Sequence, residues 1–66
     1  MKEFTDALVS YVGKNVIVYL MNGFQMRGTI TEVYVGGGIR LVDEEFHNPN
    51  TIAAHAISTI KEAPSY

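Results

Sequence analysis

The residues best placed to bind a ligand flank the dipeptide Asn22-Gly23. Asn-Gly readily takes positive φ at both centres of a type I′ turn, and the runs on either side of it are rich in β-branched and aromatic residues, so they predict a β-hairpin. A two-residue turn would place Tyr19, Phe24 and Met26 on one face. Those side chains would form either a flat apolar surface for a ligand or ordinary core.

Other chemistry-bearing residues give weaker signals. A loop with metal-ligand residue types has no spacing that fixes a coordination geometry, which favours a solvated loop; these residues are Asp43, Glu44, Glu45 and His47. No Gly-Lys-Ser/Thr follows Gly36–Gly38, so the triple glycine is not a phosphate loop. Nothing in the spacing of Asp6, Ser10 and His55 supports a catalytic triad. The sequence therefore predicts a protein that is not an enzyme and has no cofactor or metal.

Length and composition favour an oligomer. A chain of 66 residues buries only about 60% of the surface that it exposes when unfolded. It has no cysteine, which removes disulfides and thiolate metal sites as reinforcement. With 47% hydrophobic and 18% charged residues, it has fewer charges than a small soluble monomer normally carries. We therefore expect a buried subunit interface.

Charge and hydropathy limit the partners. The longest apolar run, Val16–Met21, is far shorter than the ~20 residues of a membrane span, and no signal peptide precedes it, so a cytoplasmic protein without membrane partners is expected. A net charge of −2 with five Lys and Arg leaves no basic stripe. Any nucleic-acid binding would have to rest on stacking and backbone hydrogen bonds more than on phosphate neutralisation.

The hydrophobic pattern predicts a single domain over residues 1–62. Residues 2–12 have the spacing of a short amphipathic helix that ends at Gly13, and residues 14–61 read as a barrel of short strands. Gly28 marks a bend or a close approach of another backbone inside the second strand. Further strands are expected at 39–43, 51–54 and 57–61, with a frayed tail over 63–66. The expected class is mostly β: a small five-stranded, strongly bent antiparallel barrel of the SH3 or OB kind with one N-terminal helix.

Two segments resemble a known family. Asn22–Gly28 (Asn-Gly-Phe-Gln-Met-Arg-Gly) and His55–Thr59 (His-Ala-Ile-Ser-Thr) resemble the two Sm motifs of the bacterial Sm-like RNA chaperone family Hfq, and the likeness covers roughly residues 3 to 62. The first motif looks most like versions from Gram-positive bacteria. The resemblance implies an Sm-like barrel that closes into a hexameric ring by pairing the fourth strand of one subunit with the fifth of the next.

The resemblance also implies a binding surface for single-stranded, adenine-rich RNA, on the distal face of the ring opposite the helices. The matching positions are Tyr19, Gly23, Phe24, Gln25, Met26, Arg27 and Thr59. Stacking of bases on aromatic rings is worth about 1–3 kcal/mol per base and needs little positive charge. Arg27 could in addition contact a phosphate.

The second surface implied by the family, the proximal uridine site at the pore, is expected to be weak. His55 is retained, but Ala53 and Ala54 stand where the resemblance implies a tyrosine and a lysine. The expected aromatic position falls in or beside Gly36–Gly38. His55 is therefore either an RNA contact at the pore or a packed interface residue.

Two functions remain open. The first is an RNA-chaperone ring that captures mRNA or small RNA and acts in post-transcriptional regulation without covalent chemistry. The second is a protein-interaction ring that has kept the fold and lost RNA binding, which the net negative charge and Ala53-Ala54 favour.

Overall fold

The structure, a computed structural model, describes residues 8–64, and these form five strands and one short 3₁₀ helix. The elements in chain order are β1 (Asn15–Leu20), β2 (Gln25–Val33), β3 (Ile39–Asp43), β4 (Pro49–Ile52), η1 (Ala54–Ala56) and β5 (Ile57–Glu62). All pairings are antiparallel, in the order β4-β3-β2-β1-β5. The predicted third strand has the predicted bounds, whereas β4 begins earlier than expected because an edge strand tolerates Pro49.

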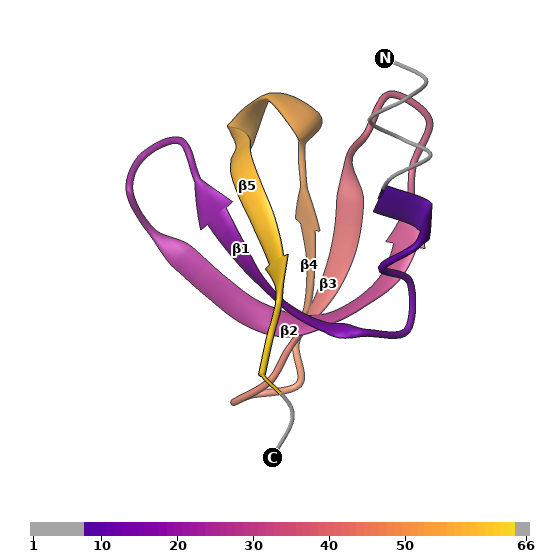
Figure 1. The fold of residues 1–66 in the computed structure, drawn as a ribbon, viewed down its shortest axis with the longest axis vertical. Coiled ribbons are helices and arrows are strands. Elements are labelled where there is room, and N and C mark those ends of the chain that lie inside the picture. The colour runs from indigo at the N-terminus through magenta and orange to yellow at the C-terminus, as the bar shows by residue number, and fades with distance from the viewer. Residues whose placement is uncertain (1–7, 65–66) are drawn as a thin grey trace.

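The sheet is strongly curved (Figure 1) and packs around one small apolar core. One face of it, here called the inner face, supplies the fully buried side chains; the core residues are Leu8, Val16, Val18, Ile30, Ile39, Leu41, Ile52 and Ile57. The β1–β2 loop and η1 lie at one end of the molecule, and the β3–β4 loop and the end of β5 lie at the other (Figure 1). None of the described residues belongs to a helix that could cross a membrane.

The predicted N-terminal helix over residues 2–12 is wrong for the part that the structure describes. Helical backbone occurs only at residues 8 and 9, turn follows at 10–13, and residues 2–7 of the prediction lie outside the described residues. The amides of Tyr11, Val12 and Lys14 bond three residues back, and the Gly13 amide donates to the Ile30 carbonyl at 2.8 Å. Leu8 and Tyr11 still pack against the core, so the apolar spacing was informative, but contacts to β2 replace helix propagation.

The hairpin register differs by one residue from the prediction. Tyr19 pairs with Gln25 and Val18 with Met26, because the loop has three residues, 21–23, instead of two. The Gly23 amide donates to the Leu20 carbonyl at 3.0 Å and Gly23 has φ +91°, as in a type I turn followed by a left-handed glycine. A one-residue change of register moves every side chain to the other face. Tyr19 and Met26 are therefore on opposite faces of the hairpin.

At Gly28, β2 closely approaches another backbone, as predicted. A Cβ at this position would overlap the carbonyl oxygen of Val42 on β3. The absence of a side chain thus lets β2 and β3 approach where the sheet bends.

Residues 63 and 64 make hydrogen bonds with the rest of the chain and are not frayed. Ala63 is buried, and its amide donates to the Asn15 carbonyl at 2.9 Å. The prediction of a frayed tail is wrong for residues 63 and 64, since an Arg27 contact described below also holds Pro64.

Candidate functional site

Three side chains from three adjacent strands form a row on the outer face of the sheet, opposite the core. Tyr19 on β1 pairs with Gln25 on β2 and with Thr59 on β5, and directly paired residues project from the same face. Gln25 and Thr59 are exposed and Tyr19 is half-buried. This outer row offers an aromatic surface flanked by an amide and a hydroxyl that can donate and accept hydrogen bonds.

The β1–β2 loop region carries exposed apolar side chains at the same end of the sheet as the outer row, but Phe24 lies opposite Leu20 and projects from the other face than Tyr19. Met21 and Phe24 are 68% and 70% exposed. The loop backbone is fixed, because the Phe24 amide donates to Asn22 Oδ1 at 3.1 Å and the Met21 amide donates to the Ala56 carbonyl at 2.9 Å. A fixed loop with exposed apolar side chains can contact a flat ligand at a low entropic cost.

Met26 lies apart from the outer row. It projects from the inner face beside Val18, is half-buried and packs against the core. The sequence grouped it with Tyr19 and Phe24 on the assumption of a two-residue turn. The three-residue loop separates Tyr19 from both, because Phe24 and Met26 are two residues apart and stay on one side, and part of the Met26 side chain remains accessible.

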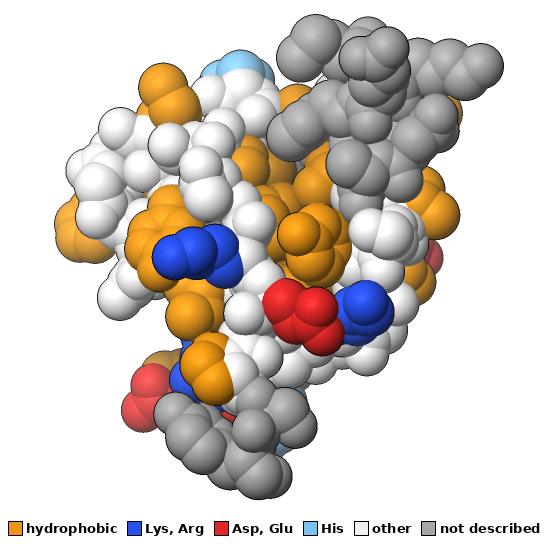
Figure 2. Space-filling view, viewed as in Figure 1, with side chains coloured by type: hydrophobic (Ala, Val, Ile, Leu, Met, Phe, Trp, Pro, Cys, Tyr) orange, Lys and Arg blue, Asp and Glu red, His pale blue; other side chains and the backbone are white. Residues whose placement is uncertain are grey.

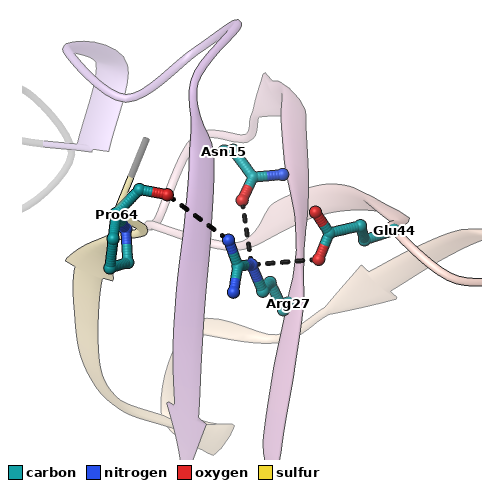
Figure 3. Close-up of polar contacts among 4 residues, drawn as sticks. All are labelled: Asn15, Arg27, Glu44 and Pro64. Carbon is teal, nitrogen blue, oxygen red and sulfur yellow. Dashed lines mark hydrogen bonds and ion pairs between the residues drawn. The ribbon is translucent and has the colours of Figure 1, made fainter. Parts of the chain in front are cut away.

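Arg27 is held by three oxygens from distant parts of the chain (Figure 3). Its Nε lies 2.9 Å from Glu44 Oε2 and 3.2 Å from Asn15 Oδ1, and an Nη donates to the Pro64 carbonyl at 3.4 Å. Asn15, Arg27, Glu44 and Pro64 are called the Arg27 cluster below. The cluster ties β2 to the β3–β4 loop and to the end of the chain, and borders a hollow of about 390 Å³ that Lys14, Glu62 and Ala63 also line.

His55 lies on η1, at the end of the sheet that carries the β1–β2 loop. Its side chain is exposed and makes no hydrogen bond or ion pair with residues 8–64. Tyr34 was not among the residues predicted from the sequence; it is 37% exposed and lies just before the glycine turn. The Tyr34 ring and the Ala54 backbone both lie within 4 Å of the point that a Cβ on Gly38 would occupy. Tyr34 is thus an aromatic residue close to the turn that carries His55, and its place before Gly36–Gly38 was the available signal.

The acidic β3–β4 loop is organised by its own hydrogen bonds. Asp43 Oδ2 accepts the Phe46 amide at 2.7 Å, and the Asp43 carbonyl accepts the His47 amide at 2.8 Å. Across residues 8–64, no three His, Cys, Asp or Glu side chains are grouped as a metal site requires. His47 takes φ +58°, a left-handed conformation that is uncommon outside glycine.

One comparison decides the family. A solved structure described as the pleiotropic translational regulator Hfq is 33% identical in sequence, with a TM-score of 0.73, over 83% of this chain and 90% of that one. The chain belongs to the Hfq family. No protein-family model and no curated protein sequence matches it. Membership in the Hfq family supports an Sm-like fold, here a five-stranded bent sheet without an α-helical element in residues 8–64.

Against the Hfq-family expectations, the structure brings some predicted site residues together and separates others. The outer row unites Tyr19, Gln25 and Thr59. Gly23 and Phe24 lie in the adjoining loop region. Met26 is on the inner face and Arg27 is held in its cluster.

Proposed function

We propose that this chain forms an RNA-binding ring that captures adenine-rich single-stranded RNA and changes its folding or pairing without covalent chemistry. The observation that carries the proposal is the outer row, which combines an accessible tyrosine with flanking hydrogen-bonding groups, while Phe24 is exposed at the same end of the sheet. Family membership supports the same assignment, since the similar solved protein is described as a translational regulator.

The chemistry of this surface suits bases better than phosphates. Tyr19 and Phe24 offer rings for stacking, and Gln25 and Thr59 can read the donor and acceptor groups at a base edge. Gly23 leaves room beside the loop, whereas Met26, on the inner face, is not part of the surface that Tyr19 offers. Arg27 serves the fold, because Glu44 neutralises its charge.

The proposed assembly is a hexameric ring closed by strand pairing. β4 and β5 are the two edges of the sheet, so each subunit has one free edge of each kind. Pairing β4 of one subunit with β5 of the next would satisfy the unpaired backbone groups of both edges and enlarge the small core. Light scattering should give a mass several times the 7.3 kDa of one chain; a monomeric mass would contradict the ring.

We further propose that the surface around His55 is a weakened uridine site. Ala53 and Ala54 provide neither a cation nor a ring, and His55 and nearby Tyr34 are the groups that could contact a base. A tyrosine ring and one imidazole, without an adjacent lysine, give little electrostatic attraction for phosphate.

A second function has a specific observation in its favour. Carboxylates neutralise Lys14 and Arg27, so the surface attracts nucleic acid weakly, and a ring that binds proteins through exposed Phe24 and Met21 would have the same features. The two functions differ in whether the ring binds an isolated oligonucleotide.

Fluorescence anisotropy with labelled oligo-adenylate, oligo-uridylate and a mixed-sequence control separates these functions. The RNA-ring proposal predicts tight adenylate binding with a shallow dependence on salt, and much weaker uridylate binding. An intact ring that binds none of the three oligonucleotides would refute it and favour the protein-interaction ring.

A further inference from the structure

The sequence predicted that Arg27 could contact a phosphate, but in the structure other groups of the chain already bind this side chain. Three oxygens surround the guanidinium, including a carboxylate of Glu44 at 2.9 Å. A phosphate approaching Arg27 would also approach the negative charge of Glu44. The net attraction at this position is therefore small.

The other described cations differ in what stands next to them. Lys14 lies 3.9 Å from Glu62, and Arg40 on β3 is paired across the ladder with Glu32 on β2. Lys61 on β5 is exposed, its cross-strand neighbour is the apolar Ile17, and it has no ion pair with residues 8–64. Neither Arg40 nor Lys61 has an ion pair with residues 8–64, but the direct cross-strand partner of Arg40 is a glutamate, whereas that of Lys61 is apolar.

The same contrast is visible on the surface. In Figure 2, one blue side chain lies among hydrophobic side chains with no red beside it, whereas the other blue side chains on that face lie next to red ones. An unpaired cation on apolar surroundings attracts an anion more strongly than one already paired.

Lys61 is also close to the outer row. It lies two residues along β5 from Thr59 and pairs with Ile17, two residues along β1 from Tyr19, so all four project from the same face. Two residues along a strand correspond to about 7 Å, a distance that the long lysine side chain can bridge. A base stacked on Tyr19 would carry its phosphate within reach of this ammonium group.

Ring closure would leave this arrangement accessible. Strand pairing uses the backbone edge of β5, whereas the Lys61 side chain stands on the face of the sheet. β4, the strand that would pair there, consists of Pro49, Asn50, Thr51 and Ile52 and brings no carboxylate.

We propose that Lys61 is the phosphate contact of the RNA surface, holding the RNA backbone next to the base that stacks on Tyr19. This inference rests on the proposed RNA-binding function. It assigns the electrostatic part of binding to β5, and it leaves Arg27 as a residue that positions β2, the β3–β4 loop and the end of the chain.

The test is the salt dependence of oligo-adenylate binding by the whole chain, wild type against Lys61→Ala. The logarithm of the association constant falls as the logarithm of the salt concentration rises. Losing one phosphate contact per bound site should make this slope less steep by about 0.7 and weaken binding about three- to tenfold at low salt. Lys61→Arg should restore both quantities. Lys14→Ala is the matched control, since its lysine is paired with Glu62, and it should leave the slope unchanged.

The outcomes separate this inference from the proposed function. Wild type that binds adenylate, with Lys61→Ala of equal slope and affinity, would overturn the role of Lys61 alone. Wild type that forms a ring and binds no oligonucleotide would overturn the proposed function. Circular dichroism and light scattering on each variant establish that the folded ring is being compared.

Discussion

The two ends of the β1–β2 hairpin are built for different tasks. At the loop end, Tyr19, Gln25 and Thr59 are accessible on the outer face and Phe24 is exposed at the same end of the sheet. At the other end, Arg27 is held by Asn15, Glu44 and Pro64. The first end leaves its polar and aromatic groups available to a ligand, whereas the second uses them to join three distant segments. Under the proposed function, recognition on this small sheet is separated from the contacts that hold it together.

The largest expected effect comes from Gly28→Ala. This substitution lies next to Arg27, at the end of the hairpin that joins distant segments. Its Cβ would overlap the Val42 carbonyl oxygen, so β2 and β3 would have to move apart, at a cost of about 3 kcal/mol in the free energy of unfolding. Urea unfolding followed by circular dichroism measures this.

Gly38→Ala is the matched control for that substitution. A Cβ there meets the Ile52 carbonyl oxygen at 3.3 Å, a tight contact that a small shift relieves, so the loss should be about 1 kcal/mol or less. Equal losses for the two variants would show that the close approach at Gly28 is not what holds the bend.

The next effect is that of Arg27→Ala on stability. The variant removes an ion pair and two hydrogen bonds from a side chain that is 36% exposed, so the free energy of unfolding should fall by about 1 kcal/mol. Adenylate affinity of the folded ring should change less than twofold. A large loss of affinity with unchanged stability would mean that Arg27 contacts RNA and that the two ends are not separated.

The smallest effect is expected at His47, in the loop that carries Glu44. Its φ of +58° is unfavourable for a residue with a Cβ, so His47→Gly should raise the free energy of unfolding by about 0.5 kcal/mol, less than the full strain because glycine gains freedom when unfolded. His47→Ala keeps the Cβ and is the control. A loss of stability in His47→Gly would show that the imidazole itself holds the loop.

Local rules predicted the parts of the fold that depend on neighbouring residues. The bounds of β3, the turn at the glycine run and the close approach at Gly28 follow from alternation and from residues without a Cβ. The family and its two motifs were also recognisable from the sequence, and the comparison with a solved structure confirmed that recognition.

Other parts required the folded chain. Asn22-Gly23 fits both a two-residue type I′ turn and a type I turn ending in a left-handed glycine, and the structure has the second. This difference of one residue in loop length decides whether Met26 shares a face with Tyr19. The turn at residues 10–13 is set by contact with Ile30, and the Arg27 cluster joins residues far apart in the sequence, so neither has a local signal.

The most direct test of the account is oligo-adenylate binding by Tyr19→Ala, with Tyr34→Ala as a control that removes an accessible tyrosine elsewhere. Loss of one stacking platform costs about 1–3 kcal/mol, so Tyr19→Ala should bind about tenfold more weakly or worse, with its ring mass intact. Tyr34→Ala should bind adenylate as wild type does. If Tyr19→Ala keeps wild-type affinity in an intact ring, the outer row is not the RNA surface and the proposed division of the hairpin is wrong.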